Sequence, residues 1–151
     1  MLDQQINQDF LTAYKNKNEA AVATLRMLRA ALVNKKIEKL IAKEAELPDE
    51  ETLLVIKSEI KKRQDSMEIY RRGERVDLAD REQAEAELLK KYLPAQLTEA
   101  AVRKTVKETI SELGVSGPGE FGKVMPAVMS KIKGQADGAV ISRLVKEELS
   151  Q

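Results

Sequence analysis

The stretch LLKKYLPAQLTEAAV, residues 88–102, joins the end of one helical pattern to the start of another. Pro94 ends the first pattern, because proline lacks the amide hydrogen that continues a helix. Thr98 then supplies a hydroxyl that can cap the amides of the next helix. We therefore expect the chain to divide here into an N-terminal helical domain, residues 1–93, and a small C-terminal helical domain, residues 94–151.

Apolar residues recur at helical spacing on both sides of this boundary. Aromatic residues form only 3% of the 151 residues and charged residues 34%, a mix typical of surface helices and poor in strand formers. The predicted fold class is all-α, with a bundle of about four helices and then a lobe of three short ones. We expect helices over residues 2–17, 18–43, 48–72, 77–93, 98–113, 123–133 and 137–149.

Short polar side chains and glycines mark the expected helix ends. The N-caps should be residues whose side-chain oxygen accepts from free amides: Asn18, Asp77 or Asp80, Thr98 and Asp137. The C-terminal ends should be glycines, which adopt left-handed backbone angles without strain: Gly73, Gly114 and Gly134.

The second predicted helix carries an apolar stripe and a basic stripe. The apolar stripe runs through Leu25, Leu28 and Leu32, and is expected to continue through Val33, Ile37 and Leu40. Basic residues fall seven apart, and therefore on one line along the helix, at Arg29, Lys36 and Lys43. That basic line can follow a nucleic-acid backbone. It can equally be a solvated face, or pair with the acidic fourth helix.

The balance of residue types argues against independent catalysis. The 26 basic and 25 acidic residues give a net charge of +1, so any anion-binding surface must come from local clustering. The chain has no histidine and no cysteine, which removes the commonest general base and any disulfide or thiolate zinc site. We expect no catalytic residue, no metal and no cofactor. Without a long apolar run or a signal sequence, the expected location is cytoplasmic, with no membrane partner.

The stretch KIKGQADG, residues 131–138, interrupts the last helical pattern. Capping alone explains it as a turn, with Lys131 and Lys133 in a last helical turn, Gly134 as the left-handed cap and Asp137 as the next N-cap. From residue 121 to residue 146, however, there are five basic residues and one acidic residue. The same turn could therefore let lysines and backbone approach a phosphate closely.

Four segments together resemble the YqeY family: TLRMLRAALVNKKIE, EIKKRQDSMEIYRRGERVDLADRE, AELLKKYLPAQL and GKVMPAVMSKIKGQADGAVISRLVKEEL. That family in turn resembles the C-terminal helical and tail region of GatB, a subunit of the glutamine-dependent tRNA amidotransferase. The resemblance implies a tail-like C-terminal lobe that contacts tRNA. It also implies a family label of carbon–nitrogen ligase with glutamine as amide donor, although the chain has no room for the catalytic cradle. Pro126 departs from the family pattern, in which we expect a small residue.

The sequence therefore predicts an amidotransferase-like accessory module that binds structured RNA, above all tRNA, without catalysis of its own. The predicted contacts are Lys123, Lys131, Lys133 and Arg143, with close approach at Gly122, Gly134 and Gly138. Two alternatives stay open. One is a component of a glutamine-dependent carbon–nitrogen ligase, acting with amidotransferase or synthetase proteins as partner subunits. The other is a helical protein–protein adaptor.

Overall fold

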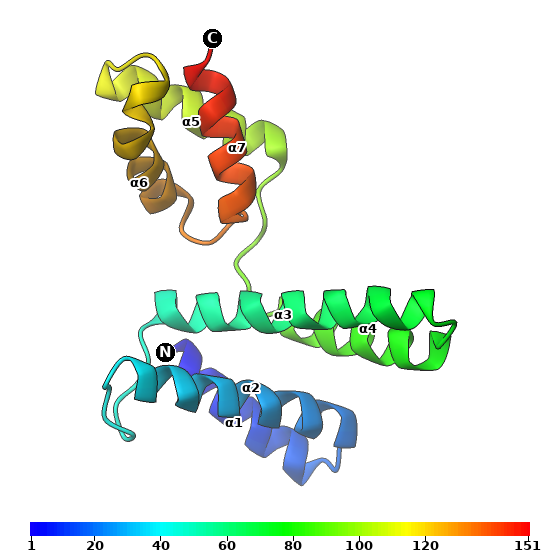
Figure 1. Ribbon diagram of the computed structural model, residues 1–151. Helices are drawn as coiled ribbons and strands as arrows, with labels where there is room; N and C mark the ends of the chain where they lie inside the picture. Colours follow the sequence, from blue (N-terminus) through cyan, green and yellow to red (C-terminus); the bar gives the residue numbers. More distant parts are fainter. The chain divides into compact units, whose positions relative to one another are not determined.

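The computed structural model describes residues 1–151 and contains no β-strand, which confirms the all-α prediction (Figure 1). The elements in chain order are α1 (Leu2–Lys15), α2 (Glu19–Glu38), α3 (Asp49–Arg72), α4 (Val76–Lys90), α5 (Glu99–Leu113), the 3-10 helix η1 (Pro118–Glu120), α6 (Phe121–Ile132) and α7 (Gly138–Leu149). The chain forms two compact units, Met1–Leu93 and Pro94–Gln151. No helix combines the length and the apolar character needed to cross a bilayer.

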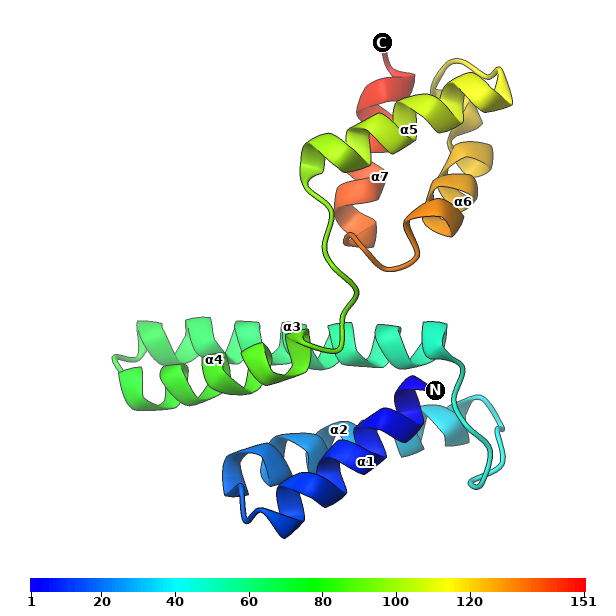
Figure 2. The ribbon, with the colours of Figure 1, turned by 180° about the vertical axis from the view of Figure 1, so that it is seen from behind.

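The N-terminal unit is built from two helical hairpins. Helix α4 lies side by side with the C-terminal part of α3, and α1 packs on α2 (Figures 1 and 2). The α1–α2 hairpin contacts α3 and α4 through one apolar core. That core contains Ile6, Ala13, Ala21, Leu25, Leu28, Leu32, Leu47, Ile56, Ile60, Ala86, Leu89 and Tyr92.

Two acidic side chains of α1, Asp3 and Asp9, help to fasten it inside this unit. The Asp3 carboxylate is buried, where it accepts from the Leu47 amide at 3.1 Å and pairs with Lys36 Nζ at 2.7 Å. Farther along α1, Asp9 Oδ2 accepts a hydrogen bond from the Tyr92 hydroxyl at 2.6 Å. Burial, together with the Asp9 carboxylate, raises the pKa of the Tyr92 phenol well above its ordinary range.

The predicted caps of α2 and α5 are confirmed. Asn18 Oδ1 accepts from the Ala21 amide and Thr98 Oγ1 from the Ala101 amide, each at 3.2 Å. The prediction for α4 is wrong, because the N-cap is Arg75, without a side-chain cap bond. Arg75 instead pairs with the carboxylate of Asp77, inside the first turn.

Helix α2 ends at Glu38, short of the predicted residue 43. Leu40 takes a left-handed φ of 57°, and its amide donates to the Ile37 carbonyl. The Ile41 amide bonds the Lys36 carbonyl at 2.9 Å, which completes a Schellman motif without glycine. The prediction of a left-handed Gly73 at the end of α3 is also wrong. Gly73 has a φ of −85°, and the left-handed residue there is Glu74.

The predicted apolar stripe of α2 is only half correct. Leu25, Leu28 and Leu32 are buried in the core. The side chains expected to continue it are exposed: Val33 at 46%, Ile37 at 66% and Leu40 at 93%. The stripe bends away from the core because these positions lie on a different face from the three leucines.

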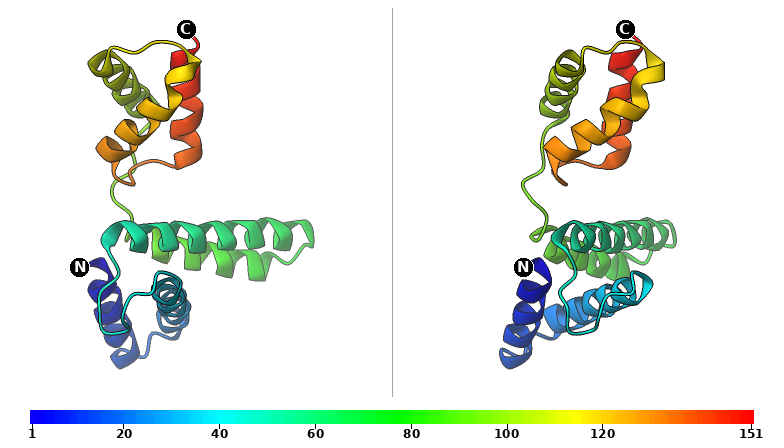
Figure 3. Two further views of the ribbon diagram at one scale, coloured as in Figure 1. Left: turned by 60° about the vertical axis from the view of Figure 1, so that its left-hand side comes forward. Right: turned by 90° about the vertical axis from the view of Figure 1, so that its left-hand side faces the viewer.

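The C-terminal unit is a cluster of three helices, α5, α6 and α7, around an apolar core (Figures 2 and 3). The core contains Val102, Val106, Val124, Val128, Ile132, Ala136, Ile141, Leu144, Val145 and Leu149. Helix α5 ends at Gly114, which has the predicted left-handed geometry with a φ of 63°. Pro126 lies inside α6, one and a half turns from its start.

Candidate nucleic-acid interface

The turn between α6 and α7 contains two consecutive left-handed residues. Gly134 has the predicted left-handed backbone, with a φ of 82°, but the C-cap of α6 is Lys133 and not Gly134. Lys133, expected in the last helical turn, lies outside the helix with φ 46° and ψ 52°. A left-handed residue with a side chain costs roughly 1 kcal/mol, so surrounding contacts must hold Lys133 in this conformation.

Hydrogen bonds from the start of the unit supply those contacts. The Leu97 amide donates to the Gln135 carbonyl at 2.7 Å, and Gln96 Nε2 donates to the Gly134 carbonyl at 3.3 Å. Ala136 is buried in the core behind the turn. The turn is thus fixed on its inner side, while the Lys133 side chain is exposed and forms no ion pair within the chain.

The N-terminus of α7 lies beside this turn and has no side-chain cap. Asp137 occupies the N-cap position, as predicted, but its carboxylate accepts no cap hydrogen bond. The first backbone bond of the helix runs from the Ile141 amide to the Asp137 carbonyl. The preceding amides at Gly138 and Ala139 are therefore free to bind an acceptor from outside, where the helix dipole favours an anion.

Three of the four predicted cations already have acidic partners. Lys131 pairs with Glu112, and Lys123 with Glu120 at 3.3 Å. Arg143 binds Glu99 at 2.9 Å and Glu147 at 3.1 Å; these hydrogen bonds raise the pKa of its guanidinium. Lys133 is the predicted cation without such a partner.

The structure separates the predicted residues into two groups. Helices α6 and α7 run in opposite directions (Figure 1). Lys131, Lys133, Gly134 and Gly138 therefore gather at the turn. Gly122 and Lys123 lie at the far end of α6, where Lys146 stands 5.5 Å from the Phe121 ring centre.

The two helical glycines have no packing role in the fold. A Cβ atom built on Gly122 or Gly138 meets nothing within 4 Å, and neither residue has a left-handed φ. A Cβ atom at Gly138 would therefore lie in open space at the α7 N-terminus. The space beside Gly122 lies at the other end of α6.

The second basic stripe, on α2, does not form. Arg29 Nε donates to Asn7 Oδ1 at 2.7 Å, and its guanidinium lies 4.3 Å from the Phe10 ring centre. Lys36 pairs with buried Asp3, and Lys43 lies beyond the end of α2. Arg29 and Lys36 therefore attach α1 to α2, and no continuous phosphate-binding line exists here.

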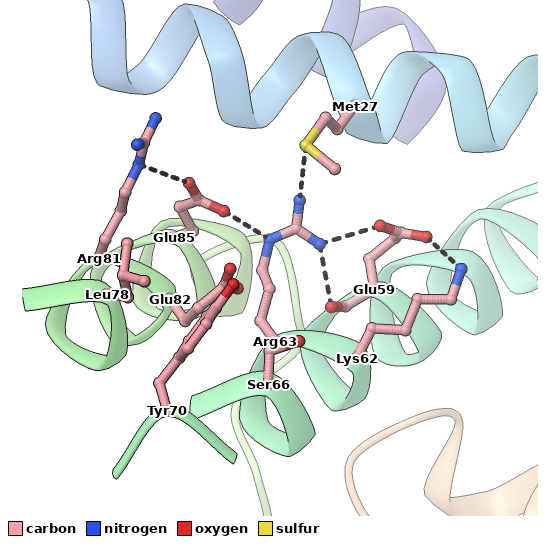
Figure 4. A pocket seen from close by; sticks show the side chains of 10 residues that line it. All are labelled: Met27, Glu59, Lys62, Arg63, Ser66, Tyr70, Leu78, Arg81, Glu82 and Glu85. Atoms are coloured by element: carbon pink, nitrogen blue, oxygen red, sulfur yellow. Dashed lines mark hydrogen bonds and ion pairs between the residues drawn. The ribbon is translucent and has the colours of Figure 1, made fainter. Parts of the chain in front are cut away.

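The N-terminal unit contains a pocket that the sequence did not predict (Figure 4). It has a volume of about 280 Å³ and is lined from α2, α3 and α4. Arg63, whose side chain is 4% exposed, donates to Glu59 Oε2 at 2.9 Å and to Glu85 Oε2 at 3.2 Å. The other oxygens of these acids pair with Lys62 and Arg81. We call this alternating set, Lys62–Glu59–Arg63–Glu85–Arg81, the charge ladder.

The pKa values of two pocket acids, Glu59 and Glu82, are shifted in opposite directions. Burial alone raises the pKa of Glu59, but hydrogen bonds from Arg63 and Lys62 outweigh it and lower that pKa overall. Burial, reinforced by the charge of Glu85, raises the pKa of Glu82. The i,i+4 spacing of Glu59 and Arg63 is the one sequence signal for this site. No group of three or more acidic side chains is placed to hold a metal ion.

Comparison with known proteins places the whole chain in one family. A protein of Pyrenophora tritici-repentis described as "Altered inheritance of mitochondria protein 41, mitochondrial" is 31% identical over 148 residues, covering 95% of this chain and 78% of the relative. An uncharacterized protein of Schizosaccharomyces pombe is 29% identical over 91 residues, covering 59% of this chain and 69% of the relative. The family described as Yqey-like protein matches residues 3–149, and this chain belongs to it.

Proposed function

We propose that this protein is a non-catalytic helical module that binds structured RNA, with tRNA as the first candidate, through the turn between α6 and α7. The observation that carries the proposal is Lys133, an unpaired cation held in a left-handed conformation next to an uncapped helix N-terminus. An ammonium group and free amides together suit a backbone phosphate. The sequence motifs that resemble the GatB tail are our reason for naming tRNA as the source of that phosphate.

The chemistry of the unit favours a folded RNA over a single strand. Single-strand binding depends on aromatic side chains that stack on bases. The C-terminal unit has one aromatic residue, Phe121, and the Lys146 side chain lies over its ring. Recognition through phosphates and shape is the mode that structured RNA offers. The small net charge predicts weak binding that a moderate salt concentration abolishes.

Filter binding of labelled bulk tRNA at low salt tests the proposal. Lys133→Glu should weaken binding about tenfold or more, because it replaces the phosphate partner with a repelling charge. Lys107→Glu is the matched control, since Lys107 is an exposed cation of the same unit without an ion pair. Equal losses in the two variants would indicate a general charge effect and sink the assignment to the turn.

A second candidate function is a protein–protein adaptor. The exposed Val33 and Ile37 of α2, and Leu40 just beyond its end, favour it, because exposed apolar side chains can mark an interface. A nuclease-resistant pull-down that recovers one protein stoichiometrically, and loses it in Ile37→Glu, would favour the adaptor over the RNA module.

Participation in a glutamine-dependent ligase rests on the family label alone. Incubation of the pure protein with misacylated tRNA, glutamine and ATP should give no amidated product, because the chain has no room for the catalytic cradle and would need partner subunits to supply the active sites. Our proposal places the protein in the cytoplasm. Cell fractionation tests that location against the mitochondrial one in the name of the Pyrenophora relative.

A further inference from the structure

We propose that the pocket between α2, α3 and α4 binds one small cationic group, an ammonium or guanidinium on a flexible stem, with the Glu82 carboxylate as its anchor. This site lies in the N-terminal unit and is independent of the RNA proposal.

The charge ladder leaves one pocket acid without a partner. Both oxygens of Glu59 and both oxygens of Glu85 are engaged by cations of the ladder. Glu82 lines the same pocket and forms no hydrogen bond or ion pair within the chain. Arg63 and Arg81 act on Glu82 only from a distance, and a partly buried carboxylate that no donor contacts is energetically unfavourable. An incoming cation would remove that cost.

The neutral polar groups of the pocket also suit a hydrogen-bond donor. The hydroxyls of Ser66 and Tyr70 line the pocket and have no hydrogen-bond partner in the chain (Figure 4). Each can accept a hydrogen bond, and the Tyr70 ring attracts cations over its face. Met27 and Leu78 complete the lining with apolar surface for the methylene stem of a ligand.

An anion fits the same pocket poorly. The one buried guanidinium, that of Arg63, already binds two carboxylates, and its remaining nitrogen contacts Met27 Sδ at 3.7 Å. Lys62 and Arg81 are mostly exposed at the rim, with side chains 69% and 71% accessible. An anion in the pocket would therefore meet the unpaired Glu82 and no free buried cation.

The size of the pocket limits the ligand to a single small group. Sites for drug-sized molecules occupy about 300–1,000 Å³, whereas this pocket measures about 280 Å³. A free diamine and the side chain of a lysine or arginine from a macromolecule carry the same chemistry and remain the two possible sources.

NMR titration of the isotope-labelled full chain distinguishes these sources. The free-amine probe is putrescine, with 1,4-butanediol as its neutral control. The side-chain probe is acetyl-Gly-Arg-Gly-amide, with the citrulline peptide as its neutral isostere. Saturable shifts in α3 and α4 with one cationic probe and not with its control support the site and identify the source. Absence of saturable shifts with both probes, or equal shifts with the neutral controls, overturns the proposal.

Variants on α4 test whether the Glu82 carboxylate binds the cationic probe. Glu82→Gln should raise the dissociation constant of the cationic probe at least tenfold. Glu87→Gln, the same change at an exposed residue of α4 that pairs with Lys90, should leave it within twofold. Unchanged affinity in Glu82→Gln overturns the proposal. If that variant fails to fold, Glu82→Asp replaces it, because it withdraws the carboxylate by one methylene. This variant should weaken binding severalfold, and unchanged affinity would also overturn the proposal.

Discussion

Lys36 Nζ on α2 lies 2.7 Å from Oδ2 of Asp3 on α1, and the two side chains are only 13% and 5% exposed. The same carboxylate accepts from the Leu47 amide. One buried acid therefore fastens α1, α2 and the segment that leads to α3. Lys36 is thus part of the fold, and not of a phosphate-binding surface.

Replacing Asp3 with Asn should lower the free energy of unfolding by about 3 kcal/mol, because it leaves the Lys36 charge buried without a counter-ion. Urea unfolding followed by circular dichroism measures the change. Glu38→Gln is the control, since it breaks only the surface pair with Lys35 and should cost less than about 0.5 kcal/mol. A loss below about 1 kcal/mol in Asp3→Asn would show that the pair is not a major support of the unit.

Tyr92→Phe should cost about 2 kcal/mol at neutral pH, because it removes a buried hydrogen bond to the charged Asp9. The pKa of Tyr92 is raised in the folded state, so its stabilising contribution is complete below pH 10 and declines as pH rises further. By pH 11 the wild type should have lost about 1 kcal/mol relative to Tyr92→Phe. A stability difference that stays constant from pH 8 to pH 11 would contradict the raised pKa.

The sequence predicts Asn18, Thr98 and Asp137 as N-caps, but their removal should change the free energy of unfolding by different amounts. Asn18→Ala and Thr98→Ala each remove an observed cap bond and should cost about 1 kcal/mol. Asp137→Ala removes no cap bond and should change the unfolding free energy by less than about 0.5 kcal/mol. It also removes a negative charge beside the α7 N-terminus, so tRNA affinity should rise. Equal destabilisation in all three variants would refute the uncapped geometry of α7.

Alanine substitutions at three glycines distinguish effects on the free energy of unfolding from effects on the proposed tRNA binding. Gly114→Ala should cost about 1 kcal/mol because of its left-handed φ. Gly122→Ala and Gly138→Ala should each add up to about 0.5 kcal/mol, since alanine is the better helix former and space is available. For tRNA, Gly138→Ala should weaken binding while Gly122→Ala should not. The opposite order in the filter assay would move the interface to the far end of α6.

Helix starts with an oxygen-bearing cap and an immediate apolar pattern were predictable. Asn18 and Thr98 satisfy both conditions, and their cap bonds are present. The early end of α2 was not predictable, because neither glycine nor proline marks it. Leu40 completes that motif in a conformation that leucine rarely adopts. At Arg75, pairing with Asp77 supplies a contact that residue preferences for caps do not include.

The candidate sites were predictable only in part. The sequence indicates that Lys131, Lys133 and Gly134 are neighbours in one turn, since they are adjacent in the chain. It does not indicate that Glu112, nineteen residues away on α5, binds Lys131. The pocket depends on similar long-range pairs: Glu85 reaches Arg63 across twenty-two positions, from α4 to α3. Such pairings follow from helix packing, which a one-dimensional pattern does not encode.

The most direct test of the RNA proposal is the salt dependence of tRNA binding in wild type and Lys133→Glu. Wild type should bind at low ionic strength with a shallow negative slope of log affinity against log salt, and Lys133→Glu should bind more weakly with a reduced slope. Lys107→Glu should keep the wild-type slope. No binding of the wild type at low salt, or an unchanged slope and affinity in Lys133→Glu, would contradict a phosphate contact at the α6–α7 turn.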